Sequence, residues 1–280
     1  MKELHIVNGG MGKCIIFTSL LNKLEERYGQ KLYLHTVHNE VLDNHPSIKK
    51  IIPTYDWLDR GGCLKNFKEF DTVIHNDPYY SSYIWDDVSM KETFFNLYDL
   101  EFENDKNDIP ITYHSELVAE RYENKQYYIF QFTGGQSVWT FDNYAQMGQY
   151  RNYDFNRAMK LVEMLSYSFP NVNFLDFSFA NEYNINYPNV TKYHGNFIGI
   201  QTLLKNSLGF ISIDSSLQHV AATKQIDKKG IVLWNSANTT PEKVGYEENT
   251  NLIFNGLYPI QINEIEIMEK IEPFLSRPSI

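Results

Sequence analysis

Cysteine and long apolar runs are the scarcest features of this 280-residue sequence. Its two cysteines, Cys14 and Cys63, lie in different local contexts, so neither a disulfide framework nor a cysteine-based zinc site is expected. No apolar run approaches the roughly 20 residues that span a bilayer, so we expect no membrane span. The chain enters a strand-like run directly after Lys2 and Glu3, without the pattern of a signal peptide. These absences favour a protein of a reducing cytoplasm.

Positive charge is also in short supply. Lys and Arg number 25 against 35 Asp and Glu, which gives a net charge of −10. Such a chain gets no general electrostatic help in binding DNA, RNA or anionic membranes. The first half is locally basic at Lys49, Lys50, Arg60, Lys65 and Lys68. That group leaves two interpretations open, a solvated face or a contact with nucleic acid.

The strongest local pattern lies at residues 209–222. It begins as a continuous apolar run typical of a buried strand, breaks at Asp214-Ser215-Ser216, and continues with helical spacing. Short polar residues at such a break cap the helix and leave free backbone N–H groups beyond the end of the strand. Open α/β sheets bind ligands at that edge, and helix N-termini favour anions such as a diphosphate. A plain Asp/Ser cap without a ligand is the alternative interpretation.

A related pattern opens the chain, where a strand-like run at residues 4–7 leads through Gly9, Gly10 and Gly12 into a helical pattern. Glycines of this kind let the backbone approach a ligand closely. Two stricter motifs are incomplete. Cys14 stands where the Walker A motif needs a hydroxyl, and Ile15 stands where the dinucleotide fingerprint needs its third glycine. A generic glycine turn before a helix remains.

Two side chains of the first half are candidates for chemistry. Lys13 lies at a helix N-terminus and opposes the helix dipole unless it has an anion to bind. This favours a functional lysine over the alternative of an exposed, solvated one. Asp77 follows a predicted strand at residues 70–76, and a carboxylate just past a strand end is a candidate general base. A turn-forming Asp-Pro pair is the other interpretation of Asp77.

Strands and helices alternate along the whole chain. We predict strands at residues 4–7, 31–37, 48–53, 70–76, 127–132, 172–177, 209–213, 229–234 and 251–254, and helices at residues 13–28, 91–100, 156–169, 196–206, 217–223 and 262–275. The charged segment at residues 120–126 marks a boundary between domains 1–125 and 126–280. The alternation predicts an α/β protein with two doubly wound, Rossmann-like domains facing each other across a cleft. The last helix can pack back on the N-terminal domain.

At three places the sequence resembles the GT-B glycosyltransferases of the ADP-heptose:lipopolysaccharide heptosyltransferase kind. These are the glycine turn at residues 9–12, the restart at Gln131-Phe132-Thr133-Gly134, and residues 214–222, which look like the family's Asp-Ser/Thr-Gly-x-x-His-x-Ala-Ala. The resemblance implies transfer of a sugar from a nucleotide-diphosphate donor to an acceptor hydroxyl. It implies no metal and no cofactor beyond the donor, which is a co-substrate.

The resemblance also implies roles for individual residues. The implied donor-binding residues are Gly10, Gly12, Thr133, Gly134, Arg151, Asp176, Asp214, Ser215, Ser216, Gln218 and His219. The family carries Met-Gly-Asp at the first loop, where that Asp is the presumed base, whereas this chain has Met11-Gly12-Lys13. We therefore assign catalysis to Asp77 as base, with Asp214 as second choice, and to Lys13 as a cation for the leaving diphosphate.

Three interpretations of function follow. A surface glycan is the expected acceptor. The Gly-Lys opening resembles a divergent branch of these transferases from phages and some bacteria, so a hydroxymethylated pyrimidine in phage DNA, modified in the host cytoplasm, is the alternative. The change of the family's Asp to Lys13 motivates a third interpretation, a non-catalytic module that binds a nucleotide sugar.

Overall fold

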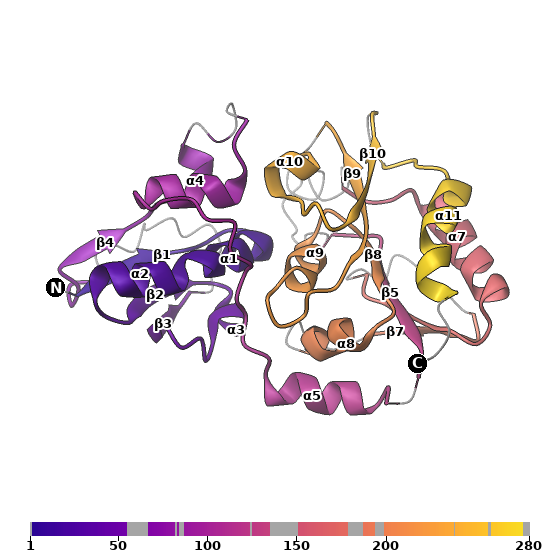
Figure 1. Ribbon diagram of the computed structural model, residues 1–280, viewed down its shortest axis with the longest axis horizontal. Helices are drawn as coiled ribbons and strands as arrows, with labels where there is room; N and C mark the ends of the chain where they lie inside the picture. Colours follow the sequence, from indigo (N-terminus) through magenta and orange to yellow (C-terminus); the bar gives the residue numbers. More distant parts are fainter. Residues whose placement is uncertain are drawn as a thin grey trace. The chain divides into compact units, whose positions relative to one another are not determined.

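The computed structural model describes residues 2–54, 67–81, 83, 87–123, 125–134, 151–178, 187–193, 199–237, 239–256 and 259–276. The chain divides into two compact units, and Figure 1 labels most of their strands and helices. The first unit contains Met1–Thr112 with Ala222–Gln225 and Glu242–Val244, and the second contains the remainder. Among the described residues, no helix has both the length and the apolar character needed to cross a membrane.

The first unit is built on a four-stranded, all-parallel sheet of order β3-β2-β1-β4. Its strands are β1 (Glu3–Ile6), β2 (Leu32–Thr36), β3 (Ile48–Pro53) and β4 (Thr72–Ile74). Its helices are α1 (Met11–Phe17), the 3₁₀ turn η1 (Thr18–Leu20), α2 (Leu21–Tyr28), α3 (Asn39–Leu42), the 3₁₀ turn η3 (Pro78–Tyr80) and α4 (Met90–Leu97).

The helix predicted at residues 13–28 is divided in the structure. The hydroxyl of Thr18 donates to the carbonyl of Ile15 at 2.6 Å, and that of Ser19 donates to Ile16 at 2.8 Å. Hydroxyls that bond back to the preceding turn compete with the regular helical pattern, and here a 3₁₀ turn joins α1 to α2. The predicted end at Gly29 is confirmed, because this residue has a φ of 63° in the left-handed region.

The second unit is built on a six-stranded, all-parallel sheet of order β10-β9-β8-β5-β6-β7. Its strands are β5 (Tyr127–Gln131), β6 (Asn173–Asp176), β7 (Val190–Lys192), β8 (Phe210–Ile213), β9 (Gly230–Asn235) and β10 (Thr250–Phe254). The helices from residue 113 onward are α5 (Tyr113–Glu120), α7 (Phe155–Ser168), α8 (Ile200–Asn206), α9 (Ser216–Ala221), α10 (Pro241–Val244) and α11 (Glu264–Leu275).

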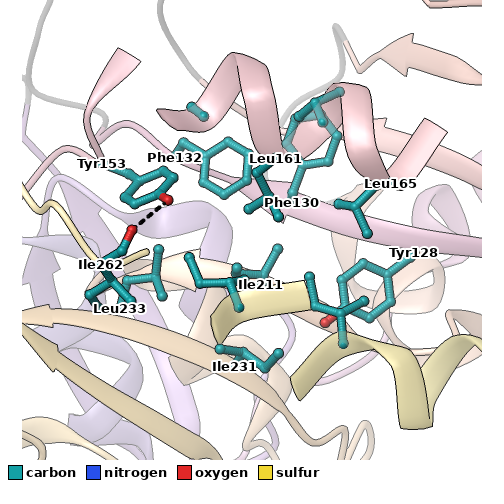
Figure 2. Close-up of a cluster of buried hydrophobic side chains, with 14 of the residues drawn as sticks. Tyr128, Phe130, Phe132, Tyr153, Leu161, Leu165, Ile211, Ile231, Leu233 and Ile262 are labelled. Carbon is teal, nitrogen blue, oxygen red and sulfur yellow. Dashed lines mark hydrogen bonds between the residues drawn. The ribbon is translucent and has the colours of Figure 1, made fainter. Parts of the chain in front are cut away.

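The core of the second unit lies between this sheet and the pair α7 and α11. Figure 2 shows Phe130 of β5, Phe132 just after it and Ile211 of β8 on the side of the sheet that faces Leu161 of α7. All four side chains are fully buried. The hydroxyl of Tyr153 donates to the carbonyl of Ile262 at 2.8 Å, drawn as a dashed line in Figure 2. Fully burying each such apolar side chain stabilises the fold by about 1.5–3 kcal/mol. This core therefore fixes the position of β5 and β8.

The opposite face of the same sheet is covered by helices as well. Tyr127 of β5 donates from its hydroxyl to the carbonyl of Leu203 in α8 at 3.0 Å. Every residue of β5 is buried, as expected for a parallel sheet with helices on both faces. The prediction of an α/β chain with two doubly wound parallel sheets is confirmed.

Two details of the second unit concern its first and last helices. The first continuous stretch of the first unit runs to Thr112, and α5 belongs to the second unit, where Ser115 and Thr202 of α8 share a hydrogen bond of 2.8 Å. The last helix, α11, packs beside α7 within the second unit (Figure 1). Glu264 at the start of α11 accepts hydrogen bonds from Arg157 and Lys160 of α7, which joins the two helices.

The strand orders define one switch point in each sheet. In the first sheet the chain runs from β1 outward through β2 to β3 and then returns to β4 on the other side of β1. In the second it runs from β5 outward through β6 to β7 and returns to β8 on the other side of β5. Open α/β sheets bind ligands beyond the carboxyl ends of the strands at such points. The two candidate positions are therefore the carboxyl ends of β1 and β4 and those of β5 and β8.

Candidate functional site

The first switch point holds a buried ion pair. Lys13 lies in the first turn of α1, after β1, and Asp77 follows β4. The Nζ atom of Lys13 donates to Oδ2 of Asp77 at 2.8 Å, and the two side chains are only 5% and 8% exposed. The lysine therefore has an anion within its own unit, and the interpretation of an exposed, solvated lysine is wrong.

The backbone of the preceding glycine turn makes room for this lysine. Gly9 has a φ of +107°, and a Cβ atom added to it would lie 2.9 Å from Nζ of Lys13. Gly10 is exposed, and an added Cβ would meet nothing within 4 Å. Gly12 lies within α1 and is partly buried. Gly9 is therefore the position of this turn where a glycine is required, because its φ is positive and a side chain would meet Lys13. Gly10 and Gly12 were instead the positions that the sequence predicted as donor contacts.

Asp77 uses its two carboxylate oxygens differently. Oδ2 holds Lys13 and lies 3.8 Å from Nε2 of His75, while Oδ1 accepts from the backbone N–H of Tyr79 at 3.1 Å. The second contact caps the turn η3, which has Pro78 at its first position. The turn-forming interpretation of Asp77 is therefore confirmed at Oδ1, and its role as a general base stays a prediction.

The second switch point is joined by a hydrogen bond that the sequence did not suggest. The hydroxyl of Ser215 donates to Oε1 of Gln131 at 2.7 Å and accepts from the N–H of Leu217 at 3.3 Å. Gln131 is the last residue of β5 and is buried. In the sequence, Gln131 stood out only as the first residue of the restart Gln131-Phe132-Thr133-Gly134, and no contact was predicted for its side chain. Ser215 and Ser216 are partly exposed, so the start of α9 is open to solvent.

Asp214 is buried between two partners. Nε2 of Gln218 donates to its Oδ1 at 2.8 Å, and Nη1 of Arg151 lies 3.7 Å from its Oδ2. Burial raises the pKa of the Asp214 carboxyl, while the charge of Arg151 and the hydrogen bond from Gln218 oppose that rise. Gln218 itself is fully buried. Asp214 thus ties the end of β8 to α9 and holds a cation beside the open start of that helix.

Of the other predicted donor residues of the second unit, Thr133 and Asp176 are buried and Gly134 is partly exposed. The N–H of Gly134 donates to Oδ1 of Asn152 at 3.0 Å, and Asp176 accepts from the N–H of Ser178 at 2.8 Å. Oγ1 of Thr133 is buried and has no hydrogen-bond partner among the described residues. Beside the start of α9, Ser215 and Ser216 are partly exposed, and the side chain of Arg151 is 44% exposed.

His219 supports α9 from within the unit. Its Nδ1 atom lies 2.9 Å from the hydroxyl of Tyr246, and the two rings meet edge to face at 5.6 Å between centroids. The histidine is buried. It therefore braces the helix that carries Ser216 rather than presenting its ring to solvent.

Some predicted features lie outside the described residues, among them Cys63, Arg60, Lys65 and the segment 135–150 that follows Gly134. Of the basic group, Lys49 and Lys50 lie exposed near the start of β3. Lys68 precedes β4 and is exposed. Within the described part of the chain, no group of three or more His, Cys, Asp or Glu residues is arranged to hold a metal ion.

Comparison with solved structures identifies this architecture. Escherichia coli ADP-heptose lipopolysaccharide heptosyltransferase II is similar over 98% of both chains, with a TM-score of 0.70 and 14% sequence identity. A glycosyl transferase family 9 protein from Veillonella parvula is similar over 98% of this chain and 97% of that chain, with a TM-score of 0.68 and 12% identity. The chain has the GT-B fold of the heptosyltransferases.

A third GT-B structure was solved with a nucleotide. The E. coli heptosyltransferase WaaC with ADP is similar over 98% of this chain and 97% of that chain, with a TM-score of 0.62 and 14% identity. No protein-family model matches the sequence, and no curated protein matches it. Within this GT-B fold, the roles of individual residues therefore rest on the geometry of the two switch points.

Proposed function

We propose that this protein is a glycosyltransferase that moves a sugar from a nucleotide-diphosphate donor to an acceptor hydroxyl without a metal ion. One observation carries the proposal. The start of α9, at the switch point of the second sheet, combines the partly exposed Ser215 and Ser216 with the half-exposed guanidinium of Arg151. The fold is shared with a heptosyltransferase that was solved with ADP.

The proposed donor contacts follow from the charge that develops on the leaving diphosphate. Backbone N–H groups and the positive end of a helix stabilise such an anion, and so does a nearby cation. Arg151 is held by Asp214 only at 3.7 Å, so its guanidinium retains donors for a phosphate. Gln131 and His219 would act from behind, by holding Ser215 and α9 in place.

The acceptor hydroxyl needs a base, and we assign that role to Asp77. Its Oδ2 atom would accept the proton as the new glycosidic bond forms, while Oδ1 remains bonded to the N–H of Tyr79. Lys13 would keep Oδ2 in one position through its 2.8 Å hydrogen bond. The non-catalytic module was motivated by Lys13, which stands where the resembled family has its presumed base. Asp77 supplies a carboxylate at the same switch point, and this favours an enzyme over a binding module.

A glycan is the acceptor that the geometry favours over DNA. The described members of the basic group, Lys49, Lys50 and Lys68, lie toward the amino edge of the first sheet, because they lie in the first half of β3 or before β4. Asp77 lies at the carboxyl edge. DNA binding depends on cations that neutralise phosphates near the reacting base, and these lysines are at the opposite edge.

A thermal-shift screen with ADP-, GDP- and UDP-sugars tests the donor site, because a ligand that binds only the folded chain raises its melting temperature. We expect one nucleotide class to raise Tm. The double variant Ser215→Ala/Ser216→Ala should weaken that binding at least tenfold, and Ser168→Ala, an exposed serine at the end of α7, should leave it unchanged. A screen without any Tm rise, or equal binding by the double variant, would contradict the donor site.

A second measurement separates catalysis from binding. With the donor found in the screen, Asp77→Asn should reduce sugar transfer at least a hundredfold while the donor-induced Tm rise persists. A donor that binds the parent chain without turnover on any acceptor would instead support the non-catalytic module.

A further inference from the structure

Two exposed tyrosines lie directly beside the candidate base. Tyr79 and Tyr80 form the last two positions of η3, immediately after Asp77 and Pro78, and they are 48% and 60% exposed. Single exposed aromatic residues are ordinary, but two in succession at the carboxyl edge of β4 place ring surface where this sheet is expected to bind a ligand.

The turn that carries these rings is held by several contacts. Oδ1 of Asp77 caps it, and the hydroxyl of Ser81 donates to the carbonyl of Pro78 at 2.6 Å. Tyr79 meets the ring of Tyr83 edge to face, with 6.0 Å between the ring centroids. A preorganised aromatic surface binds a ligand at a lower entropic cost than a flexible one.

Two further contacts join the tyrosines to the buried pair of Lys13 and Asp77 and to the neighbouring His75. Nζ of Lys13 lies 5.3 Å from the ring centroid of Tyr79, and the ring of His75 lies 6.0 Å from that of Tyr80. Tyrosine presents an apolar face together with a hydroxyl, which suits a sugar ring because the sugar also combines a C–H face with hydroxyls. The arrangement therefore offers ring surface within a few residues of a carboxylate.

We propose that Tyr79 and Tyr80 form a stacking subsite for a sugar ring of the acceptor, which brings one of its hydroxyls to Asp77. This proposal rests on the glycosyltransferase function proposed above and names its acceptor class as a saccharide. A substitution that removes the rings should weaken acceptor binding and leave the donor site in the second unit intact.

A nucleobase is the competing occupant, since bases also stack on aromatic side chains. Binding of a nucleic acid also needs cations for its phosphates. Among the described residues of the first unit, the two lysines near the turn are both engaged. Lys13 is paired with Asp77, and Nζ of Lys243 donates to the carbonyl of Tyr83 at 3.0 Å. Lys49, Lys50 and Lys68 lie toward the opposite edge of the sheet. A neutral saccharide has no such need, so the charge around the turn favours the sugar.

Saturation-transfer NMR on the full chain tests the subsite without requiring turnover. The probes are methyl α-D-glucopyranoside, methyl α-D-galactopyranoside and methyl α-D-mannopyranoside, with thymidine as the nucleobase probe. We expect transfer to the ring C–H protons of at least one glycoside, reduced at least fivefold in Tyr80→Ser and in Tyr79→Ser/Tyr80→Ser. Tyr113→Ser, at another exposed tyrosine, should retain the full signal.

Each contrary outcome has a defined meaning. A glycoside signal that is the same in the tyrosine variants, the absence of any glycoside signal with the parent chain, or a stronger signal from thymidine would overturn the subsite. These results are independent of the nucleotide-sugar screen, so failure of the donor site and failure of this subsite are distinguishable. Melting temperatures of the variants within a few degrees of the parent would show that they fold.

Discussion

At the scale of single residues, the structure explains why a lysine can occupy the first turn of α1. A cation there is unfavourable by itself, because the helix dipole places positive potential at the same end. Asp77, 64 positions further along the chain, supplies the opposing charge at 2.8 Å. Removing one member of a buried pair leaves the other charge uncompensated, which costs more than the pair contributes.

This pair predicts a specific pattern of stabilities. Lys13→Met and Asp77→Asn should each lower the free energy of unfolding by about 3 kcal/mol, the usual loss when one partner of a buried pair is removed. The double variant should lose clearly less than the sum of the two, because both charges are then gone. Urea denaturation of the four proteins measures the coupling. Additive losses would show that the two side chains do not interact.

A second residue-scale prediction concerns pH. His5 in β1 is buried beside Tyr98, and burial lowers its pKa from 6.5 to about 4. The unfolded chain therefore takes up this proton at a higher pH than the folded chain, so acid favours unfolding. The free energy of unfolding should be highest above pH 6.5 and should decrease as the pH drops toward 4. Between pH 7.5 and 5 this residue should account for a loss of about 2 kcal/mol.

The matched variant for this prediction is His5→Leu, which removes the titrating group. Urea denaturation of both proteins at pH 7.5 and pH 5 should show a smaller loss of stability for the variant. Burial also lowers the pKa of His45, so part of the acid sensitivity will persist. Equal pH dependence in both proteins would show that His5 is not responsible.

At the scale of elements, the two adjacent glycines in the turn between β1 and α1 differ in backbone conformation and in the space around them. Gly9 has a positive φ and lies against Lys13, whereas Gly10 has a φ of −64° and open space around it. Gly9→Ala should lower the free energy of unfolding by about 1–3 kcal/mol, and Gly10→Ala should change it by less than about 1 kcal/mol in either direction.

Chemical denaturation of the two alanine variants compares them directly. They differ by one position and add the same methyl group, so any difference in stability reports the local backbone and the contact with Lys13. Similar effects at both positions would contradict the assignment of the conformational need to Gly9.

The elements missed by sequence analysis have weak patterns. In α5 only Ser115 and Ala119 are buried, so its apolar periodicity is faint. The strand β7 has three residues, none of which is fully buried, and it depends on pairing with β6. Elements with a strong pattern, such as α7 and β5, were predicted within a few residues because burial on a fixed period is visible in one dimension.

At the scale of the whole molecule, the net charge of −10 bears on the choice of acceptor. An acidic chain whose exposed residues Lys49, Lys50 and Lys68 lie toward the sheet edge opposite Asp77 should bind duplex DNA weakly. In a gel-shift assay with hydroxymethylated DNA we expect no retained band at 150 mM salt with micromolar protein. Tight binding that weakens steeply as salt increases would favour the DNA interpretation.

The sequence by itself determined the two parallel sheets, the strand–glycine–helix opening, and the polar break between β8 and α9. Each of these is a local pattern of burial, turn chemistry or capping, and such patterns depend on neighbours in the chain. Only the tertiary structure decided which polar groups meet. The contacts of Lys13 with Asp77 and of Ser215 with Gln131 join residues 64 and 84 positions apart, because strand order brings their carboxyl ends together.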